Sequence, residues 1–309
     1  YRGLVERLEE DYQRWDSFTK SARLAYHSPV GVVELMPIAD DRLMAYKYVN
    51  GHPYNYKHDL PTVMAYGALA EVETGMPLLL AEMTILTAIR TAAASALAAK
   101  AVARPHSKSM AMIGNGAQAE FQILAFRAIL GVNTVRLFDI DPEATAKLQR
   151  NLAHIEHLDL VRCGSTAEAV KGCDIVTTCT ADKKRSAILT PDMIELGMHI
   201  NGIGGDAPGK TELHPEVVAN AKVFVQYEPQ TRIEGDIQQL PAEFPVTEIA
   251  RVLTGEATGR ESAEQVTLFD SVGFSIEDYS MLRYMHELLT ETGLGAPLDL
   301  IPPLADVKD

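Results

Sequence analysis

The sequence is short of cysteine, of positive charge and of long apolar runs. Its 309 residues include three cysteines, and its formal net charge is −14 at pH 7. Nucleic acid is not expected as a partner, because phosphate backbones are bound by basic surfaces. No run reaches the roughly 20 apolar residues of a membrane-spanning helix, so no membrane partner is expected. Cys163, Cys173 and Cys179 lack a metal-ligand spacing and indicate reduced thiols in a cytoplasmic protein.

The motifs of two common hydrolytic chemistries are lacking as well. The nine histidines form no H-x-x-x-H or comparable pattern, so no metal site is predicted. A G-x-S-x-G nucleophile elbow is not found either. No signal-peptide pattern is visible in the sequence, which begins at Tyr1.

The first third of the sequence predicts helices and strands of one sheet. Leu4, Leu8, Tyr12 and Trp15 fall on one side of a helix within the first 20 residues. Short apolar or alternating runs predict strands at residues 30–36, 43–49 and 77–83. Residues 58–75 look irregular, and the alanine-rich residues 84–103 predict a long, closely packed helix.

From residue 109 onward, strands and helices alternate. Strands are expected at residues 110–113, 134–138, 158–163, 175–179, 198–203, 222–225 and 265–269, and helices at 117–130, 142–154 and 166–170. This alternation predicts an α/β fold with a parallel, doubly wound sheet. A last helix at residues 276–289 is expected to pack back onto the first domain.

A glycine-rich turn suggests a dinucleotide. Gly114-x-Gly116-x-x-Ala119 follows an apolar strand and opens a helix, which is the context of a pyrophosphate-binding turn. Asp139 ends the next strand, where a carboxylate binds the adenosine ribose and repels a 2′-phosphate. The pattern predicts NAD rather than NADP; the alternative is a tight turn without a ligand.

Three further polar residues stand out, each with two readings. Asp206 follows three glycines after a strand, so it either points into the ligand cleft or caps the Pro-Gly turn that follows. Lys47 lies between tyrosines in a strand and either extends along the sheet face to solvent or serves the site. Arg90 in the alanine-rich helix either meets an anion, such as a substrate carboxylate or cofactor phosphate, or points to the surface.

Six segments together resemble the ornithine cyclodeaminase/mu-crystallin family. They occur in order across nearly the whole chain, and they are residues 47–53 (KYVNGHP), 87–93 (TAIRTAA), 113–118 (IGNGAQ), 204–210 (GGDAPGK), 227–236 (YEPQTRIEGD) and 269–273 (FDSVG). Six ordered matches are far more specific than the glycine turn alone.

The resemblance implies a homodimer of two-domain subunits. Residues 1–92 and 276–309 would form an α+β substrate-binding and dimerisation domain built from both chain ends. Residues 93–275 would form the Rossmann NAD-binding domain. The family also has an additional N-terminal segment that helps dimerisation, of which little is present before Arg23.

The resemblance also implies roles for individual residues. Arg23, Lys47 and Arg90 would neutralise the α-carboxylate of an amino-acid substrate, and Glu34 would bind its distal amine. Asp206 would be the catalytic residue that handles protons at the α-amino group, and Val272 would pack on the substrate. The residues expected to line the dinucleotide are Thr62, Arg90, Gly114, Gly116, Ala117, Gln118, Asp139, Thr180, Asn201, Ile203, Lys210 and Ser271.

The activity implied is conversion of L-ornithine to L-proline and ammonia, with NAD taking a hydride and returning it. Such an activity belongs to ornithine catabolism and proline biosynthesis. The alternatives within the family are a lysine cyclodeaminase, an NAD-dependent amino-acid dehydrogenase and a ketimine reductase. An alternative of another class is a dinucleotide-dependent binding protein without turnover.

Overall fold

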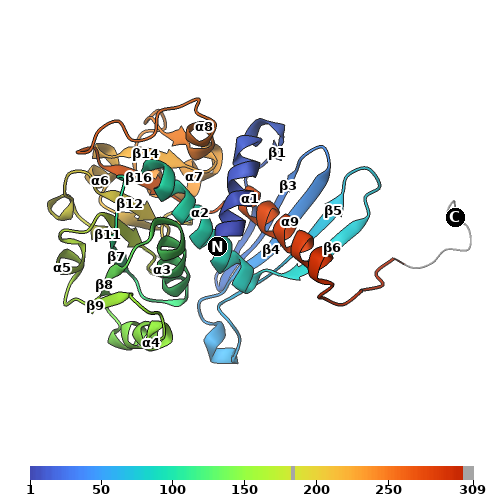
Figure 1. Ribbon diagram of the computed structural model, residues 1–309, viewed down its shortest axis with the longest axis horizontal. Helices are drawn as coiled ribbons and strands as arrows, with labels where there is room; N and C mark the ends of the chain where they lie inside the picture. The colour runs from blue at the N-terminus through green and yellow to red at the C-terminus, as the bar shows by residue number, and fades with distance from the viewer. Residues whose placement is uncertain (182–184, 302–309) are drawn as a thin grey trace, which may run out of the picture.

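A computed structural model of the chain, which describes residues 1–181 and 185–301, contains an antiparallel and a parallel sheet on either side of helix α2 (Thr84–Val102) (Figure 1). The antiparallel sheet is formed by the first third of the chain. Helices from the N- and C-terminal segments cover one of its faces. The parallel sheet is formed by the middle of the chain. This arrangement confirms the predicted fold class.

The antiparallel sheet has the order β1-β3-β4-β5-β6, with β2 paired to β3. Its strands are β1 (Thr19–Lys20), β2 (Leu24–Ser28), β3 (Gly31–Ala39), β4 (Leu43–Gly51), β5 (Val63–Glu71) and β6 (Pro77–Glu82), with 3-10 turns η1 (Trp15–Ser17) and η2 (Asn55–His58). Helices α1 (Arg2–Gln13) and α9 (Ser275–Thr292) lie side by side over this sheet (Figure 1). The predicted stripe of Leu4, Leu8 and Tyr12 is buried here.

Strand β5 was not predicted, and the expectation of irregular chain at residues 58–75 was wrong for this part. Ala65, Gly67 and Leu69 alternate toward the helices and are buried. Two of these three residues are too small to give a clear hydrophobic alternation. Gly67 is required by packing, since a Cβ there would lie 3.0 Å from Met83 Cγ and 3.2 Å from Leu282 Cδ1.

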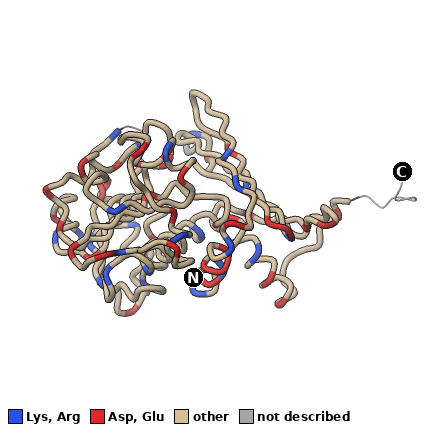
Figure 2. The backbone as a smooth tube through the Cα atoms, turned by 90° about the horizontal axis from the view of Figure 1, so that it is seen from above, with Lys and Arg blue, Asp and Glu red and all other residues tan. Residues whose placement is uncertain are grey.

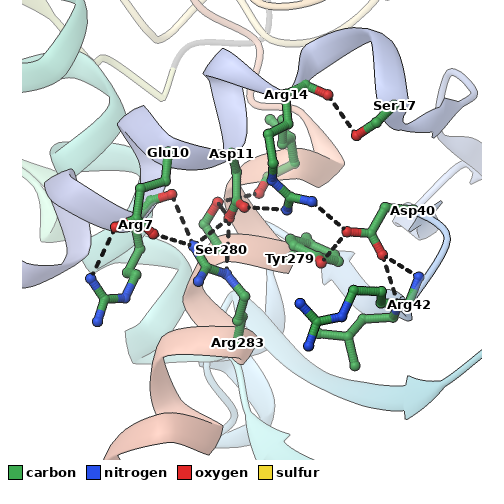
Figure 3. A network of polar contacts seen from close by, with 12 residues as sticks. Arg7, Glu10, Asp11, Arg14, Ser17, Asp40, Arg42, Tyr279, Ser280 and Arg283 are labelled. Carbon is green, nitrogen blue, oxygen red and sulfur yellow. Dashed lines mark hydrogen bonds and ion pairs between the residues drawn. The ribbon is translucent and has the colours of Figure 1, made fainter.

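A polar network locks the two chain ends together (Figure 3). Asp11 on α1 is fully buried and accepts hydrogen bonds from Ser280 (2.8 Å) and Arg283 (3.2 Å) of α9. Tyr279 donates to Asp40 (2.8 Å) in the turn between β3 and β4. The network therefore holds α9 in position against α1 and the turn between β3 and β4. The first turn of α9 carries residues of the candidate site.

The parallel sheet has the order β15-β14-β16-β12-β10-β7-β8-β9. Its strands are β7 (Ser109–Ile113), β8 (Thr134–Phe138), β9 (Asp159–Arg162), β10 (Ile175–Thr178), β12 (His199–Gly202), β14 (Lys222–Val225), β15 (Thr247–Glu248) and β16 (Thr267–Asp270). The strand order reverses between β7 and β10, which is the switch point at which such sheets bind ligands beyond the carboxyl ends of their strands.

The elements around this sheet are short apart from α3. They are α3 (Ala117–Leu130), α4 (Pro142–Leu152), α5 (Thr166–Val170), α6 (Pro215–Asn220), α7 (Glu228–Glu234), α8 (Ile249–Leu253), η3 (Pro191–Met193) and η4 (Asp236–Gln239). Strands β11 (Arg185–Leu189) and β13 (Thr211–Leu213) pair separately. Acidic and basic positions are interspersed along the chain (Figure 2).

Among the described residues, α2 is the one helix that is long and apolar enough to cross a membrane. Of the 18-residue stretch that meets this criterion, 56% is buried inside the protein. Its small side chains belong to two cores. Ala93 and Leu97 pack in the core of the antiparallel sheet, whereas Ala92 and Ala96 pack in the core that contains β7 and α3. The predicted close packing of this alanine-rich helix is confirmed.

Candidate functional site

The glycine turn lies at the switch point, between β7 and α3. Gly114 has φ +89°, and a Cβ there would lie 2.8 Å from the carbonyl oxygen of Cys179. Gly116 and Ala117 are exposed, so the first turn of the 14-residue helix α3 faces solvent with its free N–H groups. These groups and the helix dipole attract an anion such as a pyrophosphate.

Asp139 stands beside this turn, at the end of β8. One carboxylate oxygen accepts the Asn115 N–H (2.6 Å), and the other accepts the Asp141 N–H (2.8 Å). Each carboxylate oxygen has two lone pairs, so both can still accept ribose hydroxyls. Asp139 thus both holds the turn and offers acceptors to a ligand.

Other predicted dinucleotide residues line the carboxyl edge of the neighbouring strands. Buried Asn201 donates to Gln122 (3.2 Å) and Thr177 (3.3 Å), and its Oδ1 has no hydrogen-bond partner among the described residues. Gln118 donates to the carbonyl of Ala88 (3.1 Å), which connects α3 to α2. A free buried acceptor beside exposed helix N–H groups fits a dinucleotide. Ile203 follows β12 and is buried, and Ser271 follows β16 and is buried as well.

Asp206 lies in the loop after β12, half-exposed, with Lys210 Nζ 2.9 Å from its carboxylate. The turn that follows closes through the backbone, where Lys210 N–H donates to Ala207 (3.0 Å). Asp206 is therefore open to a ligand and paired with a cation. Thr62 lies apart from these contacts: it is exposed just before β5, and its carbonyl accepts from His52 N–H (2.8 Å).

Two predicted cations meet carboxylates of α9. Lys47 Nζ and Arg90 Nε lie 2.9 and 3.0 Å from the same oxygen of Asp278, and Arg90 also pairs with Glu277. All four side chains are buried. The alternatives of a solvent-reaching Lys47 and a surface-directed Arg90 were wrong. Burial and the nearby Arg90 charge lower the pKa of Lys47 to about 8.

The third predicted cation, Arg23, connects the antiparallel sheet with the end of β16. Its guanidinium lies 3.0 Å from Glu34 and 3.1 Å from Glu234, and it donates to the carbonyls of Val272 (2.5 Å) and Gly273 (3.0 Å). Burial, with the negative charges of Glu34 and Asp206, raises the pKa of Glu234 to about 7, although the positive charge of Arg23 lowers it.

Arg23 and Arg90 both approach Gly273, Arg23 at its carbonyl oxygen and Arg90 at its Cα. Gly273 has φ +74°, and a Cβ there would lie 2.7 Å from Arg90 Nη1. We call this assembly the ion cluster; its members are Arg23, Glu34, Lys47, Arg90, Glu234, Glu277 and Asp278. Val272 and Ser271 lie next to Gly273, so the ion cluster reaches the edge where the dinucleotide residues lie.

Six buried carboxylates of the site were not singled out from the sequence: Glu212, Glu234, Asp236, Asp270, Glu277 and Asp278. Glu234 and Asp236 lie inside the segment YEPQTRIEGD, and Asp270 lies inside FDSVG, so a closer reading of those segments could have found them. Glu277 and Asp278 carried the weaker signal of two acids in the first turn of a helix, which is common without any ligand.

The comparisons with known proteins agree in one family. The model of the ornithine cyclodeaminase/mu-crystallin family matches residues 2–293. The ornithine cyclodeaminase of Brucella suis biovar 1 (strain 1330) is 56% identical over 306 residues, 99% of this chain and 85% of that protein. That of Agrobacterium fabrum (strain C58) is 55% identical over 99% of this chain and 86% of that protein.

Solved structures show the same fold. An archaeal alanine dehydrogenase dimer with bound NAD superposes with a TM-score of 0.90 at 30% identity, covering 96% of this chain and 94% of that one. A lysine cyclodeaminase, described for its recognition of L-lysine, L-ornithine and L-2,4-diaminobutyric acid, superposes with a TM-score of 0.91 at 29% identity, covering 100% and 92%. With a family model that matches nearly its whole length, the chain belongs to the ornithine cyclodeaminase/mu-crystallin family.

Proposed function

We propose that the protein is an ornithine cyclodeaminase, which converts L-ornithine to L-proline and ammonia with NAD as its cofactor. The observation that carries the proposal is the convergence of Arg23 and Arg90 on Gly273, at the same sheet edge as Asp206 and the glycine turn. The high identity to ornithine cyclodeaminases supports the same activity.

The charge of the ion cluster favours a diamino acid. Its three cations face four carboxylates, so the cluster is acidic by one unit once Glu234, with its pKa of about 7, has ionised. Ornithine with two ammonium groups and one carboxylate carries a net positive charge, whereas alanine carries none. A cationic substrate therefore compensates the excess acid, and an alanine-like substrate does not.

Each polar group has a role in this proposal. Arg23, Lys47 and Arg90 bind the α-carboxylate, which competes with the protein's own carboxylates for them. Glu34 orients the distal amine. Asp206 accepts a proton from the α-ammonium group, because the reacting amine must be neutral. Val272 packs against the substrate and excludes water.

The glycine turn, Asp139 and the buried edge fit NAD. The residues that would hold it are Thr62, Arg90, Gly114, Gly116, Ala117, Gln118, Asp139, Thr180, Asn201, Ile203, Lys210 and Ser271. Bound there, NAD⁺ supplies reversible hydride transfer at the substrate α-carbon, which opens that carbon to the tethered distal amine. Asp139 favours NAD over NADP through its negative charge.

Incubation of the purified protein with L-ornithine and NAD⁺ tests the proposal, with L-lysine and L-alanine in parallel. We expect proline and ammonia in equal amounts and no lasting rise in NADH absorbance. NADH accumulating in step with ammonia would instead identify a dehydrogenase. Faster turnover of lysine would identify the six-membered-ring reaction, which the lysine cyclodeaminase relative makes the main competitor.

A homodimer is part of the same proposal. Leu24, Leu35, Tyr48 and Tyr66 are cross-strand neighbours on the sheet face opposite α9, and Leu24, Leu35 and Tyr66 are exposed by 64%, 38% and 44%. An apolar row of this kind is typical of an interface. Light scattering on the purified protein measures its molar mass, which distinguishes a dimer from a monomer.

The domain division and the compartment stay proposals as well. Residues 1–92 and 276–309 would act as the substrate-binding and dimerisation domain, and residues 93–275 as the NAD-binding domain. The three cysteines are free, in agreement with a reducing compartment, and we infer a cytoplasmic enzyme.

A further inference from the structure

We propose that Glu212 is a positioning residue, which couples the dinucleotide-binding edge to the loop that carries Asp206. The inference rests on the proposed function, because it concerns the placement of the proton acceptor of that reaction. Glu212 lies on β13, and its side chain is almost completely buried.

The carboxylate of Glu212 joins the ends of two strands. One oxygen accepts both the backbone N–H (2.5 Å) and the hydroxyl (2.6 Å) of Thr180, just after β10. The other accepts the N–H of Gly204 (3.0 Å), two residues before Asp206. A residue expected to contact the dinucleotide and the loop of the proton acceptor are thus held by the same side chain.

The loop is shaped to receive this carboxylate. A Cβ at Gly204 would collide with the carboxylate of Glu212, and a Cβ at Gly205 would lie 2.6 Å from Asp236 Oδ2. The two glycines therefore let the loop pack closely against the buried side chains of Glu212 and Asp236. Asp206 is the next residue, so any lift of Gly204 moves the carboxylate that faces the substrate.

Two further buried carboxyl groups hold the backbone around Glu212 in place. Asp236 Oδ1 accepts the N–H groups of Glu212 and Leu213, both at 2.9 Å. Asp270, at the end of β16, accepts the N–H groups of Asp236 (3.0 Å) and Ile237 (2.9 Å). Three buried carboxyl groups therefore link β13, η4 and β16 beneath the loop through hydrogen bonds from backbone N–H groups, and burial raises the pKa of each carboxyl group.

Glu212→Gln tests the coupling with little change of volume. Its amide has one acceptor oxygen where the carboxylate has two, so its NH₂ group meets either the N–H of Gly204 or the N–H of Thr180, donor against donor, and the link between the two residues is broken. We expect kcat with ornithine to fall about 100-fold, since a misplacement near 1 Å costs that much, while the KM for ornithine changes less than threefold. Glu216→Gln, at an exposed position of α6, is the matched control and should keep wild-type values.

A double-mutant cycle separates positioning from a general structural role. Thr180→Val removes the hydroxyl donor but keeps the N–H. If Thr180 and Gly204 are coupled through Glu212, the double variant should lose little more kcat than Glu212→Gln alone. Gly204→Ala displaces the carboxylate without removing it, and it should reproduce the kcat loss if Glu212→Gln does not fold.

Calorimetric titration with NAD⁺ keeps the inference independent of the substrate. We expect Glu212→Gln to weaken NAD⁺ binding about threefold to tenfold, because the donor–donor contact shifts the side chain that holds Thr180 and Gly204 together. If the wild type makes no proline, the proposed function fails, and this titration still tests the coupling. Unchanged kcat and NAD⁺ affinity in a folded Glu212→Gln, or additive losses in the cycle, would overturn the inference.

Discussion

The glycine turn and the ion cluster hold polar groups in different ways. At the turn, the groups open to a ligand are the backbone N–H groups of the exposed residues Gly116 and Ala117, which are adjacent in sequence. In the ion cluster, seven charged side chains from five elements and one loop compensate one another in the interior. The turn can be built by one strand and one helix, whereas the cluster exists only when the whole chain has folded.

This difference explains why each half suits its ligand. Backbone N–H groups cannot lose their polarity, and they bind a pyrophosphate in the same way at any physiological pH. Buried ion pairs are more sensitive: removing one partner leaves an uncompensated charge. In the function we propose, the ion cluster would therefore respond to the charge of the substrate, whereas the glycine turn would not need to.

The largest effect is expected where the two halves meet, at Asp206. Asp206→Asn keeps the shape of the side chain but cannot accept a proton, so kcat should fall about 1,000-fold, within the range of general base catalysis. NAD⁺ affinity should change less than twofold, because the glycine turn is untouched. Proline formation and a calorimetric NAD⁺ titration measure the two. A fully active Asp206→Asn would remove this residue from its assigned role.

Lys47→Met tests the claim that the ion cluster depends on mutual compensation. The substitution leaves Asp278 with Arg90 alone, and we expect a loss of about 3 kcal/mol in the free energy of unfolding. Lys47→Met combined with Asp278→Asn should recover part of it. Urea denaturation measures both variants, with the exposed Lys147→Met as control. If the double variant is less stable than the single one, the pair does not act as a compensated unit.

The same difference determined what could be predicted from the sequence. The glycine turn was found because Gly114, Gly116 and Asp139 signal it at fixed spacings between a strand and a helix. The parallel sheet followed from the alternation of elements, and the long helix from its composition. Strand β5 was missed because Ala65 and Gly67 give almost no hydrophobic signal in spite of being buried.

The ion cluster could be predicted only in part: Lys47 and Arg90 stood out in the sequence itself, whereas Arg23 and Glu34 were found only through the family resemblance. Arg23 and Asp278 are 255 positions apart, and no periodicity tells which carboxylate approaches Lys47. Their meeting depends on α9 returning to the first sheet, which the network around Asp11 fixes. The cations were therefore expected to meet a substrate carboxylate, while their protein partners on α9 went unnoticed.

Glu234→Gln tests whether the stability that the ion cluster contributes depends on pH. The folded pKa of Glu234 is about 7, above the ordinary 4.5, so the folded state holds the proton more firmly than the unfolded chain. This group's contribution to stability is therefore full below about pH 4.5 and is lost as the pH rises to about 7 and beyond, by on the order of 2 kcal/mol. The wild type should lose this much relative to Glu234→Gln between pH 5 and pH 8.

Denaturant titrations across this range give the slope, and Glu228→Gln on the same helix, at a partly exposed position, is the control. Parallel stability curves for the wild type and Glu234→Gln would show that Glu234 does not titrate in this window. Burial also raises the pKa of Asp270, outside the ion cluster, to about 7, so the contribution of Glu234 is the difference between the wild-type and Glu234→Gln curves.

The smallest effect is expected at the glycine turn, for Asp139→Ala. This change removes the acceptor of two backbone N–H groups and the charge that repels a 2′-phosphate. We expect the ratio of NAD⁺ to NADP⁺ affinity to fall about tenfold, close to 1.4 kcal/mol, with the larger part from weaker NAD⁺ binding. Asp141→Asn, which alters a carboxylate two residues away, should leave the ratio unchanged. Calorimetric titration with both dinucleotides gives the ratio directly. An unchanged preference in Asp139→Ala would mean that Asp139 does not contact the ribose. Other residues at the carboxyl edge of the parallel sheet would then select the cofactor.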